Sequence, residues 1–166
     1  DRRVTWKEYE LIEPSPKTSY RREITWSVFN EKANRFANLL LQRGIKKGDK
    51  VAILMMNGLE WLPIYFGILK TGALAVPLNF RYSSDEIEYC VNLAEADVLV
   101  FGNSFIGRVE EIADRISKGR LLIYVGEGCP GFADDYNSLA ANCSSQSPAI
   151  PIFEDDDAAI YFSSGT

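Results

Sequence analysis

The residues with the clearest chemical potential are Ser163-Ser164-Gly165-Thr166, which follow the apolar stretch 158–162. That stretch, Ala-Ala-Ile-Tyr-Phe, predicts a short buried strand. Small residues after a strand allow the backbone to approach a ligand, and their N–H groups and hydroxyls can surround phosphate oxygens. Ser163, Ser164, Gly165 and Thr166 are therefore a candidate phosphate-binding loop, although the same four residues also occur in ordinary turns.

A second motif, Gly126-x-Gly128-x-x-Gly131, has the glycine spacing of a dinucleotide-binding turn and directly follows the apolar stretch 121–125. In a dinucleotide site the motif opens a long amphipathic helix that leads to a second strand with an acidic tip. Here a polar, irregular segment follows instead. We interpret these glycines as a surface turn and not as an NAD site.

Four consecutive acidic residues, Glu154-Asp155-Asp156-Asp157, could suggest a divalent metal. Consecutive side chains in a loop point in different directions and rarely converge on one ion. We therefore predict no metal site in the chain. We interpret the run as a solvated segment that discourages edge pairing of the strand after it.

Composition argues against several other classes of chemistry. The 166 residues include no histidine and three scattered cysteines, Cys90, Cys129 and Cys143, none of which belongs to a C-x-x-C pair. A zinc site, a Ser-His-Asp triad, a Cys-His nucleophile and a disulfide scaffold are therefore not expected, and a reducing, cytoplasmic setting fits. The net charge of −5 argues against a nucleic-acid partner, and no apolar run is long enough for a transmembrane segment.

The elements that must position the candidate loop follow from the apolar pattern. Continuous apolar stretches, typical of strands covered on both faces, lie at 51–55, 73–76, 97–101, 121–125 and 158–162. The first four recur at a spacing that leaves room for one helix and two short loops. This pattern predicts a three-layer α/β fold over residues 1–166, a single subdomain with a mainly parallel sheet and helices on both faces.

The stretches between the strands carry helical spacing. Apolar stripes lie at 29–41, 87–94 and 109–116. Gly44 is a predicted C-cap of the first helix, and Ser83 with Glu86 three residues later predicts a capping box for the second. The segment 126–157 predicts a long surface connection with one short helix near 135–141.

The stretch 59–69 has very little polar surface. We expect a helix buried almost all round, between the sheet and another layer. Its aromatic residues Trp61, Tyr65 and Phe66 could line a ligand pocket, but dense aromatic residues on a buried helix usually belong to the core. We therefore assign them to the core.

Four stretches form a larger pattern: Thr25-Trp26-Ser27, RGIKKGDKVAI (43–53), LKTGALAVPLN (69–79) and FSSGT (162–166). In this order and at these separations they resemble the N-terminal part of AMP-forming acyl-CoA synthetases. This adenylate-forming superfamily also holds luciferases and peptide-synthetase adenylation domains. The resemblance covers about residues 23–166. FSSGT is similar to the first half of the family's phosphate-binding loop, usually Y-T-S-G-T-T-G-x-P-K, whereas Val28-Phe29 stands where the first signature usually has Glu-Leu.

The resemblance implies a two-step reaction for a parent ligase. A carboxylate attacks the α-phosphate of Mg²⁺-ATP to give an acyl-adenylate and pyrophosphate, and the thiol of coenzyme A (CoA) then displaces AMP. The resemblance also implies that Ser163, Ser164, Gly165 and Thr166 contact the ATP phosphates. The family's adenine pocket, Mg²⁺ ligands, acyl pocket and catalytic lysine all follow later in the chain. We therefore expect no catalytic residue and no metal ligand here, and interpret the chain as an inactive N-terminal fragment.

The sequence indicates the carboxylic acid substrate and the acyl acceptor less clearly than it indicates the family. The stretch 78–89 is more similar to fatty-acyl and medium-chain ligases than to peptide-synthetase domains. An adenylation domain or a luciferase-like member with another acceptor is an alternative within the superfamily. A self-standing flavodoxin-like binding module is an alternative of another class.

We predict that the 166-residue chain alone binds Mg²⁺-ATP weakly or not at all, because it holds half of the expected phosphate loop and none of the expected partner residues. Isothermal titration calorimetry with Mg²⁺-ATP measures this directly. Micromolar binding by the chain alone would contradict the interpretation as an inactive fragment.

Overall fold

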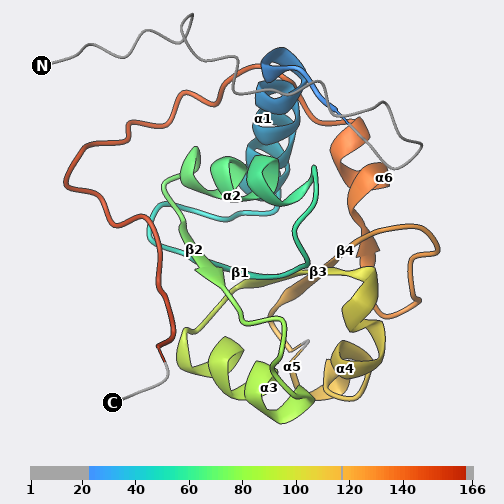
Figure 1. The fold of residues 1–166 in the computed structure, drawn as a ribbon. Coiled ribbons are helices and arrows are strands. Elements are labelled where there is room, and N and C mark those ends of the chain that lie inside the picture. Colours follow the sequence, from blue (N-terminus) through green and yellow to red (C-terminus); the bar gives the residue numbers. More distant parts are fainter. Residues whose placement is uncertain (1–22, 117, 164–166) are drawn as a thin grey trace, which may run out of the picture.

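One parallel sheet organises the protein (Figure 1). The structure is a computed structural model that describes residues 23–116 and 118–163. The strands are β1 (Lys50–Leu54), β2 (Leu74–Pro77), β3 (Val98–Gly102), β4 (Leu121–Val125) and β5 (Asp134–Asp135). They lie in the order β2-β1-β3-β4-β5, and every neighbouring pair is parallel. The predicted parallel α/β fold is confirmed.

Helices cover both faces of this sheet (Figure 1). One face carries α1 (Trp26–Gln42), α2 (Trp61–Leu69) and α6 (Tyr136–Ala141). The opposite face carries α3 (Ser84–Leu93), the 3₁₀ turn η1 (Asn103–Phe105), α4 (Ile106–Glu110) and α5 (Ala113–Ile116). Alternate strand residues serve the two cores: Val51 and Ile53 of β1 pack with the first group, and Ala52 and Leu54 with the second.

The cores explain why continuous apolar stretches predicted the strands. β3 lies in the middle of the sheet and is buried at every position, so both faces of the strand require apolar residues. β5 was missed because its two residues are both Asp and carry no apolar signal. It still pairs parallel with Ile123 and Tyr124 of β4 and leads directly into α6, the predicted short helix.

The prediction of a continuous helix over the third stripe is wrong, because α4 and α5 are separate. Val109, Ile112 and Ile116 are fully buried, so the apolar spacing is kept. The backbone N–H of Ile112 bonds to the carbonyl of Val109, three residues back, which tightens the chain between the two helices. Apolar spacing alone does not distinguish this arrangement from one continuous helix.

The prediction that the helix over 59–69, which is α2, is buried almost all round is also wrong. Pro63, Ile64, Gly67 and Ile68 are buried, and a Cβ on Gly67 would lie 2.8 Å from the carbonyl oxygen of Ala33, so α1 packs tightly on this face. The outward face is open: Leu62 is 51% exposed and Phe66 is 43% exposed. Within the described part of the chain, no layer covers it.

The predicted helix ends are confirmed. Gly44 follows the α1 cap with a φ of 86°, a left-handed conformation that glycine adopts without strain. At α3, Ser83 and Glu86 form a capping box: the Ser83 hydroxyl accepts from the Glu86 N–H, and the Glu86 carboxylate accepts from the Ser83 N–H at 2.8 Å. The latter hydrogen bond lowers the pKa of Glu86.

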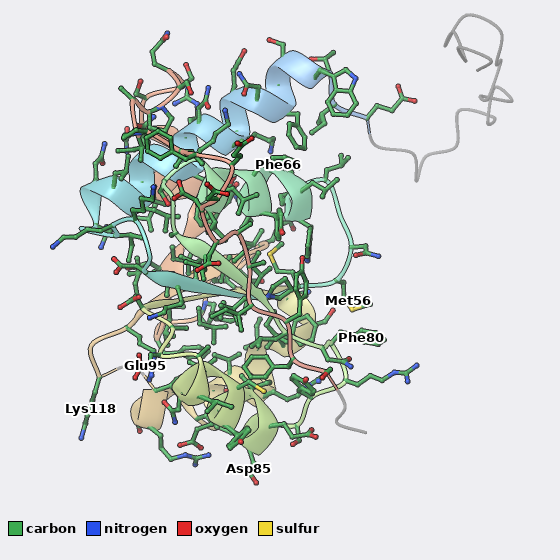
Figure 2. The ribbon with its side chains drawn as sticks, turned by 90° about the vertical axis from the view of Figure 1, so that its left-hand side faces the viewer. Met56, Phe66, Phe80, Asp85, Glu95 and Lys118 are labelled. Carbon is green, nitrogen blue, oxygen red and sulfur yellow. The ribbon has the colours of Figure 1, made fainter. Side chains whose placement is uncertain are left out.

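Loops at the carboxyl ends of the strands form one end of the molecule. Met56 and Phe80, which follow β1 and β2, project from this end in Figure 2. Both are about half exposed, at 50% and 48%. Ligands of open α/β sheets bind outside the carboxyl ends of the strands, so a candidate site is expected here.

Ser83→Ala should lower the free energy of unfolding by about 1 kcal/mol at neutral pH, because it removes an N-cap. The pKa of Glu86 is lowered in the folded state, so its contribution is full above the ordinary Glu pKa and is lost as the pH falls through the lowered value. Ser83→Ala keeps the backbone N–H but removes the hydrogen bond that the Ser83 hydroxyl donates to the Glu86 carboxylate at 3.0 Å, which also lowers the Glu86 pKa. This part of the loss should disappear in acid, so the effect of Ser83→Ala should become smaller at low pH. Urea unfolding across this pH range tests both statements, with exposed Ser147→Ala as the control; equal midpoints for the two variants at neutral pH would contradict the capping role.

Candidate functional site at the carboxyl edge of the sheet

The segment that carries the candidate loop lies on the outer edge of the sheet, beside β2. Ala159 forms an isolated parallel bridge with Ala75. The N–H of Ala75 donates to the carbonyl of Ala158 at 3.0 Å, and the N–H of Ile160 donates to the carbonyl of Ala75 at 2.9 Å. We call residues 158–163 the edge segment.

The prediction that this segment is a buried strand is wrong. Ala159 and Ile160 are half-buried, and Tyr161 is 68% exposed. The reason is its position: β2 supplies a neighbour on one side, and no described residue pairs with its other side. The apolar sequence shows that the segment packs against something, but not that it lies at an edge.

The edge segment nevertheless reaches the carboxyl ends of the strands, because its bridge to β2 is parallel. Phe162 lines a hollow of about 390 Å³ formed mainly by residues that follow β1 and β2. We call it the Phe162 hollow; its lining residues are Met55, Asn57, Trp61, Pro77, Leu78, Asn79, Phe80, Tyr82 and Phe162. Ser163 is the next residue, and Ser164, Gly165 and Thr166 lie outside the described residues.

Aromatic residues of α2 flank the edge segment. The hydroxyls of Tyr65 and Tyr161 lie 3.1 Å apart, and the rings of Trp61 and Tyr65 stack with centroids 5.4 Å apart. The hydrogen bond with Tyr161, helped by burial, raises the pKa of Tyr65 to about 12. The assignment of the three aromatics to the core therefore needs correction: Trp61 lines the hollow, Tyr65 contacts the edge segment, and Phe66 is exposed. The contact of Tyr65 with Tyr161, 96 positions away, left no signal in the sequence.

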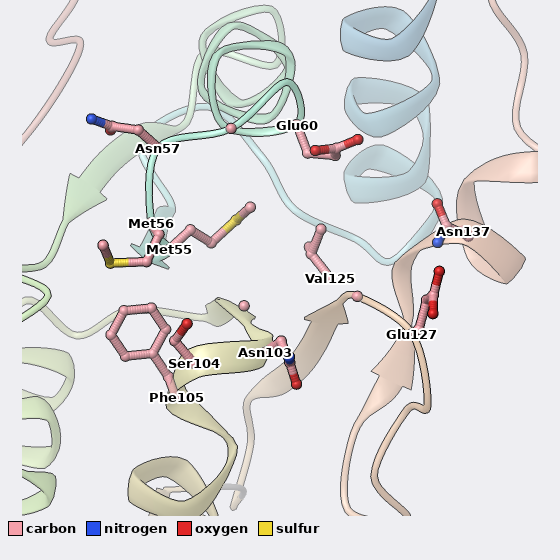
Figure 3. A pocket seen from close by; sticks show the side chains of 13 residues that line it. Met55, Met56, Asn57, Glu60, Asn103, Ser104, Phe105, Val125, Glu127 and Asn137 are labelled. Carbon is pink, nitrogen blue, oxygen red and sulfur yellow. The ribbon is translucent and has the colours of Figure 1, made fainter. Parts of the chain in front are cut away.

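A second hollow, of about 380 Å³, lies at the carboxyl ends of β1, β3 and β4 (Figure 3). Its polar side chains come from several elements: Asn57 and Glu60 before α2, Asn103 and Ser104 of η1, Glu127 after β4, and Asn137 of α6. Figure 3 shows Glu127 and Asn137 close together on one side of it. We call it the acidic hollow. It adjoins the Phe162 hollow, since Met55 and Asn57 line both.

The acidic hollow is poorly suited to phosphate. The described residues that line it include two carboxylates and no Lys or Arg, and the Glu60 carboxylate lies 3.8 Å from Nζ of Lys32, which is not a lining residue. The hollow therefore offers no cation of its own lining to a phosphate group. Tyr124 of β4 does not line the hollow but contacts two residues that do: its hydroxyl donates to the carbonyl of Glu127 at 2.8 Å and lies 3.3 Å from Oδ1 of Asn103. The tyrosine thereby joins the loops after β3 and β4.

The glycine motif after β4 forms a turn, as predicted. Gly126 borders the acidic hollow, and Gly128 adopts a φ of 70°. The next regular elements are the two-residue β5 and then α6, so no helix starts at the glycines. The positively charged end of a helix that would hold a pyrophosphate is not formed by this turn.

The acidic run is solvated only in part. Glu154, Asp155 and Asp157 are exposed, whereas the Asp156 carboxylate lies 2.5 Å from Nζ of Lys47. Across residues 23–116 and 118–163, no group of three or more His, Cys, Asp or Glu side chains is arranged to hold a metal ion.

The cysteines in the same ranges are unpaired, and burial raises the pKa of each thiol, which reduces its nucleophilicity at neutral pH.

Comparison with known proteins identifies the family. A family model described as "AMP-binding enzyme" matches residues 10–166. The chain belongs to this family. The stretches that suggested it have clear structural roles: Thr25 is the N-cap of α1, and the stretch 69–79 forms the end of α2, a turn at Gly72 and β2.

Two similar curated proteins are CoA ligases. The chain is 31% identical over 152 residues to the long-chain-fatty-acid–CoA ligase FadD13 of Mycobacterium tuberculosis, covering 91% of this chain and 29% of the relative. It is 33% identical over 150 residues to the crotonobetaine/carnitine–CoA ligase of Proteus mirabilis, covering 87% of this chain and 29% of that protein. The chain thus spans less than a third of the length of these relatives.

Solved structures agree with the sequence relatives. The anthranilate CoA ligase AuaEII, crystallised in complex with anthranoyl-AMP, superposes with a TM-score of 0.82 at 28% identity, over 87% of this chain and 28% of that one. Apo MatB from Rhodopseudomonas palustris superposes with a TM-score of 0.75 at 29% identity, over 89% of this chain and 28% of that one.

Within the described residues, no helix has the length and apolar character needed to cross a membrane.

The contact between Tyr65 and Tyr161 makes a prediction for NMR titration of the tyrosine ring ζ-carbons. In the unmodified chain the pKa of Tyr65 should be about 12, and Tyr161→Phe should move it toward the ordinary value of about 10. Tyr136, whose pKa burial raises to about 12, is a matched control and should not move. A Tyr65 pKa that is unchanged in Tyr161→Phe would show that the edge segment does not pack on α2 as described.

Proposed function

We propose that the chain is the N-terminal subdomain, residues 1–166, of a longer AMP-forming acyl-CoA ligase. The full-length ligase would activate a carboxylic acid with ATP and transfer the acyl group to CoA. The observation that carries this proposal is the parallel bridge between Ala159 and Ala75 in a member of the AMP-binding enzyme family. The bridge directs Phe162 and Ser163 to the carboxyl edge of the sheet, where the loops after β1 and β2 meet.

In this proposal Ser163, Ser164, Gly165 and Thr166 bind the β- and γ-phosphates of ATP. Backbone N–H groups and hydroxyls at a strand end supply donors, and phosphoryl chemistry depends mainly on such electrostatic positioning. The donor set fits phosphate oxygens but not a bare cation. Mg²⁺ would therefore be held by the phosphates and by residues outside the chain.

The substrate proposed is a carboxylic acid, with a fatty or medium-chain acid favoured by the stretch 78–89. The relatives support the general class, since their names include ligases for long-chain fatty acids, crotonobetaine or carnitine, and anthranilate. These substrates differ widely in shape, so the names do not select one. A carrier protein or an oxygenase reaction in place of CoA is the alternative within the superfamily.

A flavodoxin-like binding module is the second candidate, and the strand order β2-β1-β3-β4-β5 favours it, because flavodoxin-like sheets share this order. Such a module would bind its ligand between the loops after β1 and β3, which is where the acidic hollow lies. The two carboxylates of that hollow disfavour a phosphate-bearing cofactor. We therefore prefer the ligase, and propose a cytoplasmic location from the cysteine usage.

The test measures two reactions of the full-length protein with a panel of carboxylic acids. The first is the exchange of pyrophosphate into ATP that occurs only when a carboxylic acid substrate is added, and the second is the formation of a thioester with CoA. Ser163→Ala should raise the KM for ATP about tenfold or more, since a hydrogen bond to a charged group is lost. Ser147→Ala, in the connection before the edge segment, is the control and should leave the KM unchanged. Release of ADP in place of AMP, or a Ser163→Ala enzyme with unchanged KM for ATP, would contradict the proposal.

A further inference from the structure

The edge segment is weakly attached to the sheet. Its backbone contributes one isolated bridge, with two hydrogen bonds to Ala75, and an exposed edge pairing of this kind opens easily. A loop that must hold phosphate groups in a defined place needs a more precisely placed support. Within the segment, Tyr161 contacts Tyr65, and Ile160 and Phe162 pack against the core. The side chains just before the segment add a further support for Phe162 and Ser163.

The connection that leads to the edge segment runs from α6 past α1 and α2 to the outer side of β2 (Figure 1). Its first part is held by α1. Asn34 donates to the carbonyl of Ser145 at 2.8 Å, and Asn38 donates to the carbonyls of Ser144 and Gln146 at 2.8 and 2.9 Å. These contacts lie at the far end of the connection and do not by themselves position residue 158.

The last part is held by a cluster around Lys47, which lies in the turn between α1 and β1. Nζ of Lys47 lies 2.5 Å from Oδ2 of Asp156 and 5.0 Å from the centre of the Phe153 ring. The same Asp156 oxygen accepts from the N–H of Phe153 at 2.8 Å, and the N–H of Asp156 donates to the carbonyl of Phe153 at 3.1 Å. Residues 153–156 thus form a turn that is closed by its own hydrogen bonds, and the Lys47 ammonium attaches this turn to the one before β1.

Gly72 allows this cluster to lie close to the sheet. It has a φ of 75°, and a Cβ at this position would lie 2.9 Å from Cγ of Lys47 and 3.2 Å from Cδ1 of Ile152. Its carbonyl accepts from the N–H of Gly48 at 2.9 Å, which ties the two turns together. We call Lys47, Gly72, Phe153 and Asp156 the clasp. Gly72 lies two residues before β2, so the clasp is attached to the strand that the edge segment pairs with.

We propose that Lys47 is a positioning residue for ATP: its ion pair with Asp156 holds the connection against Gly72 and so places the edge segment and Ser163. This inference rests on the proposed function, because it assigns the clasp to the same phosphate loop. The side chain of Asp156 is 20% exposed, and its pKa is lowered mainly by the Lys47 contact, which agrees with a formed ion pair. Loss of this ion pair is expected to loosen the edge segment without unfolding the sheet, because partly exposed ion pairs contribute little to overall stability.

Amide hydrogen exchange in the 166-residue chain tests the structural half of the proposal. Lys47→Met keeps most of the apolar stem and removes the charge, so the Ile160 amide should exchange about three- to tenfold faster, while amides in β1 and β3 are unchanged. Asp156→Asn should have a similar effect, and the double variant should add little to either single variant. Lys46→Met and Asp155→Asn are the matched controls, because each removes the same charge from the neighbouring exposed residue.

Kinetics in the full-length ligase tests the functional half. Lys47→Met should raise the KM for ATP about three- to tenfold and leave the KM for the carboxylic acid unchanged, and Lys47→Arg, which keeps the charge, should stay within about twofold of the unmodified enzyme. Equal Ile160 exchange in Lys47→Met and Lys46→Met would overturn the proposal. An unchanged KM for ATP, or an Arg variant as impaired as the Met variant, would overturn it as well.

The two proposals fail separately. If the unmodified full-length protein catalyses no pyrophosphate exchange that depends on an added carboxylic acid, the proposed ligase function is wrong. The proposed role of Lys47 in positioning the phosphate loop for ATP is then wrong as well. If that activity is present but Lys47→Met matches Lys46→Met in both the Ile160 exchange rate and the KM for ATP, only the positioning role of the clasp is wrong. If Lys47→Met fails to fold, the β1 and β3 amides reveal it, and Asp156→Asn then decides the question.

Discussion

The arrangement of the carboxyl edge depends on one parallel contact, the bridge between Ala159 and Ala75 at the open side of β2. An antiparallel contact would have sent Ser163 to the opposite end of the sheet, away from the loops after β1 and β2. Because the contact is parallel, Phe162 reaches the same edge as Asn57 and Asn79. The position of the bridge at an edge also makes it weak, and this explains why contacts from α2 and from the turn at Lys47 gather around it.

The two hollows of that edge differ in chemistry although they share Met55 and Asn57. The Phe162 hollow is bordered by aromatic residues and lies next to Ser163, whereas the acidic hollow carries Glu60 and Glu127. A nucleotide with several negative charges is expected beside the first and is repelled from the second. The acidic hollow lies where a flavodoxin-like sheet would bind a ligand, so strand order alone does not separate the two functional candidates. The family match and the lack of a Lys or Arg in the described lining of the hollow both favour the ligase.

Much of the fold could be predicted from sequence, because its signals are local. β1 to β4 carry continuous apolar runs, and the Ser83–Glu86 capping box and Gly44 mark helix ends within a few residues. The wrong predictions concern which other parts of the protein pack against a helix or strand. The open face of α2 at Phe66 and the edge position of Tyr161 depend on which layers exist beyond them, and apolar residues do not report this. The ion pair of Lys47 with Asp156 joins positions 109 residues apart, and nothing in either neighbourhood predicts the partner.

We propose above that the edge segment presents a phosphate loop at the carboxyl edge of the sheet, beside the Phe162 hollow. A crystal structure of the full-length protein with a non-hydrolysable ATP analogue tests it most directly. We expect β- and γ-phosphate oxygens within hydrogen-bond distance of backbone N–H groups and hydroxyls of residues 163–166, with Ala159 still paired to Ala75. Phosphates bound in the acidic hollow, or an edge segment detached from β2 while the nucleotide is bound, would contradict it.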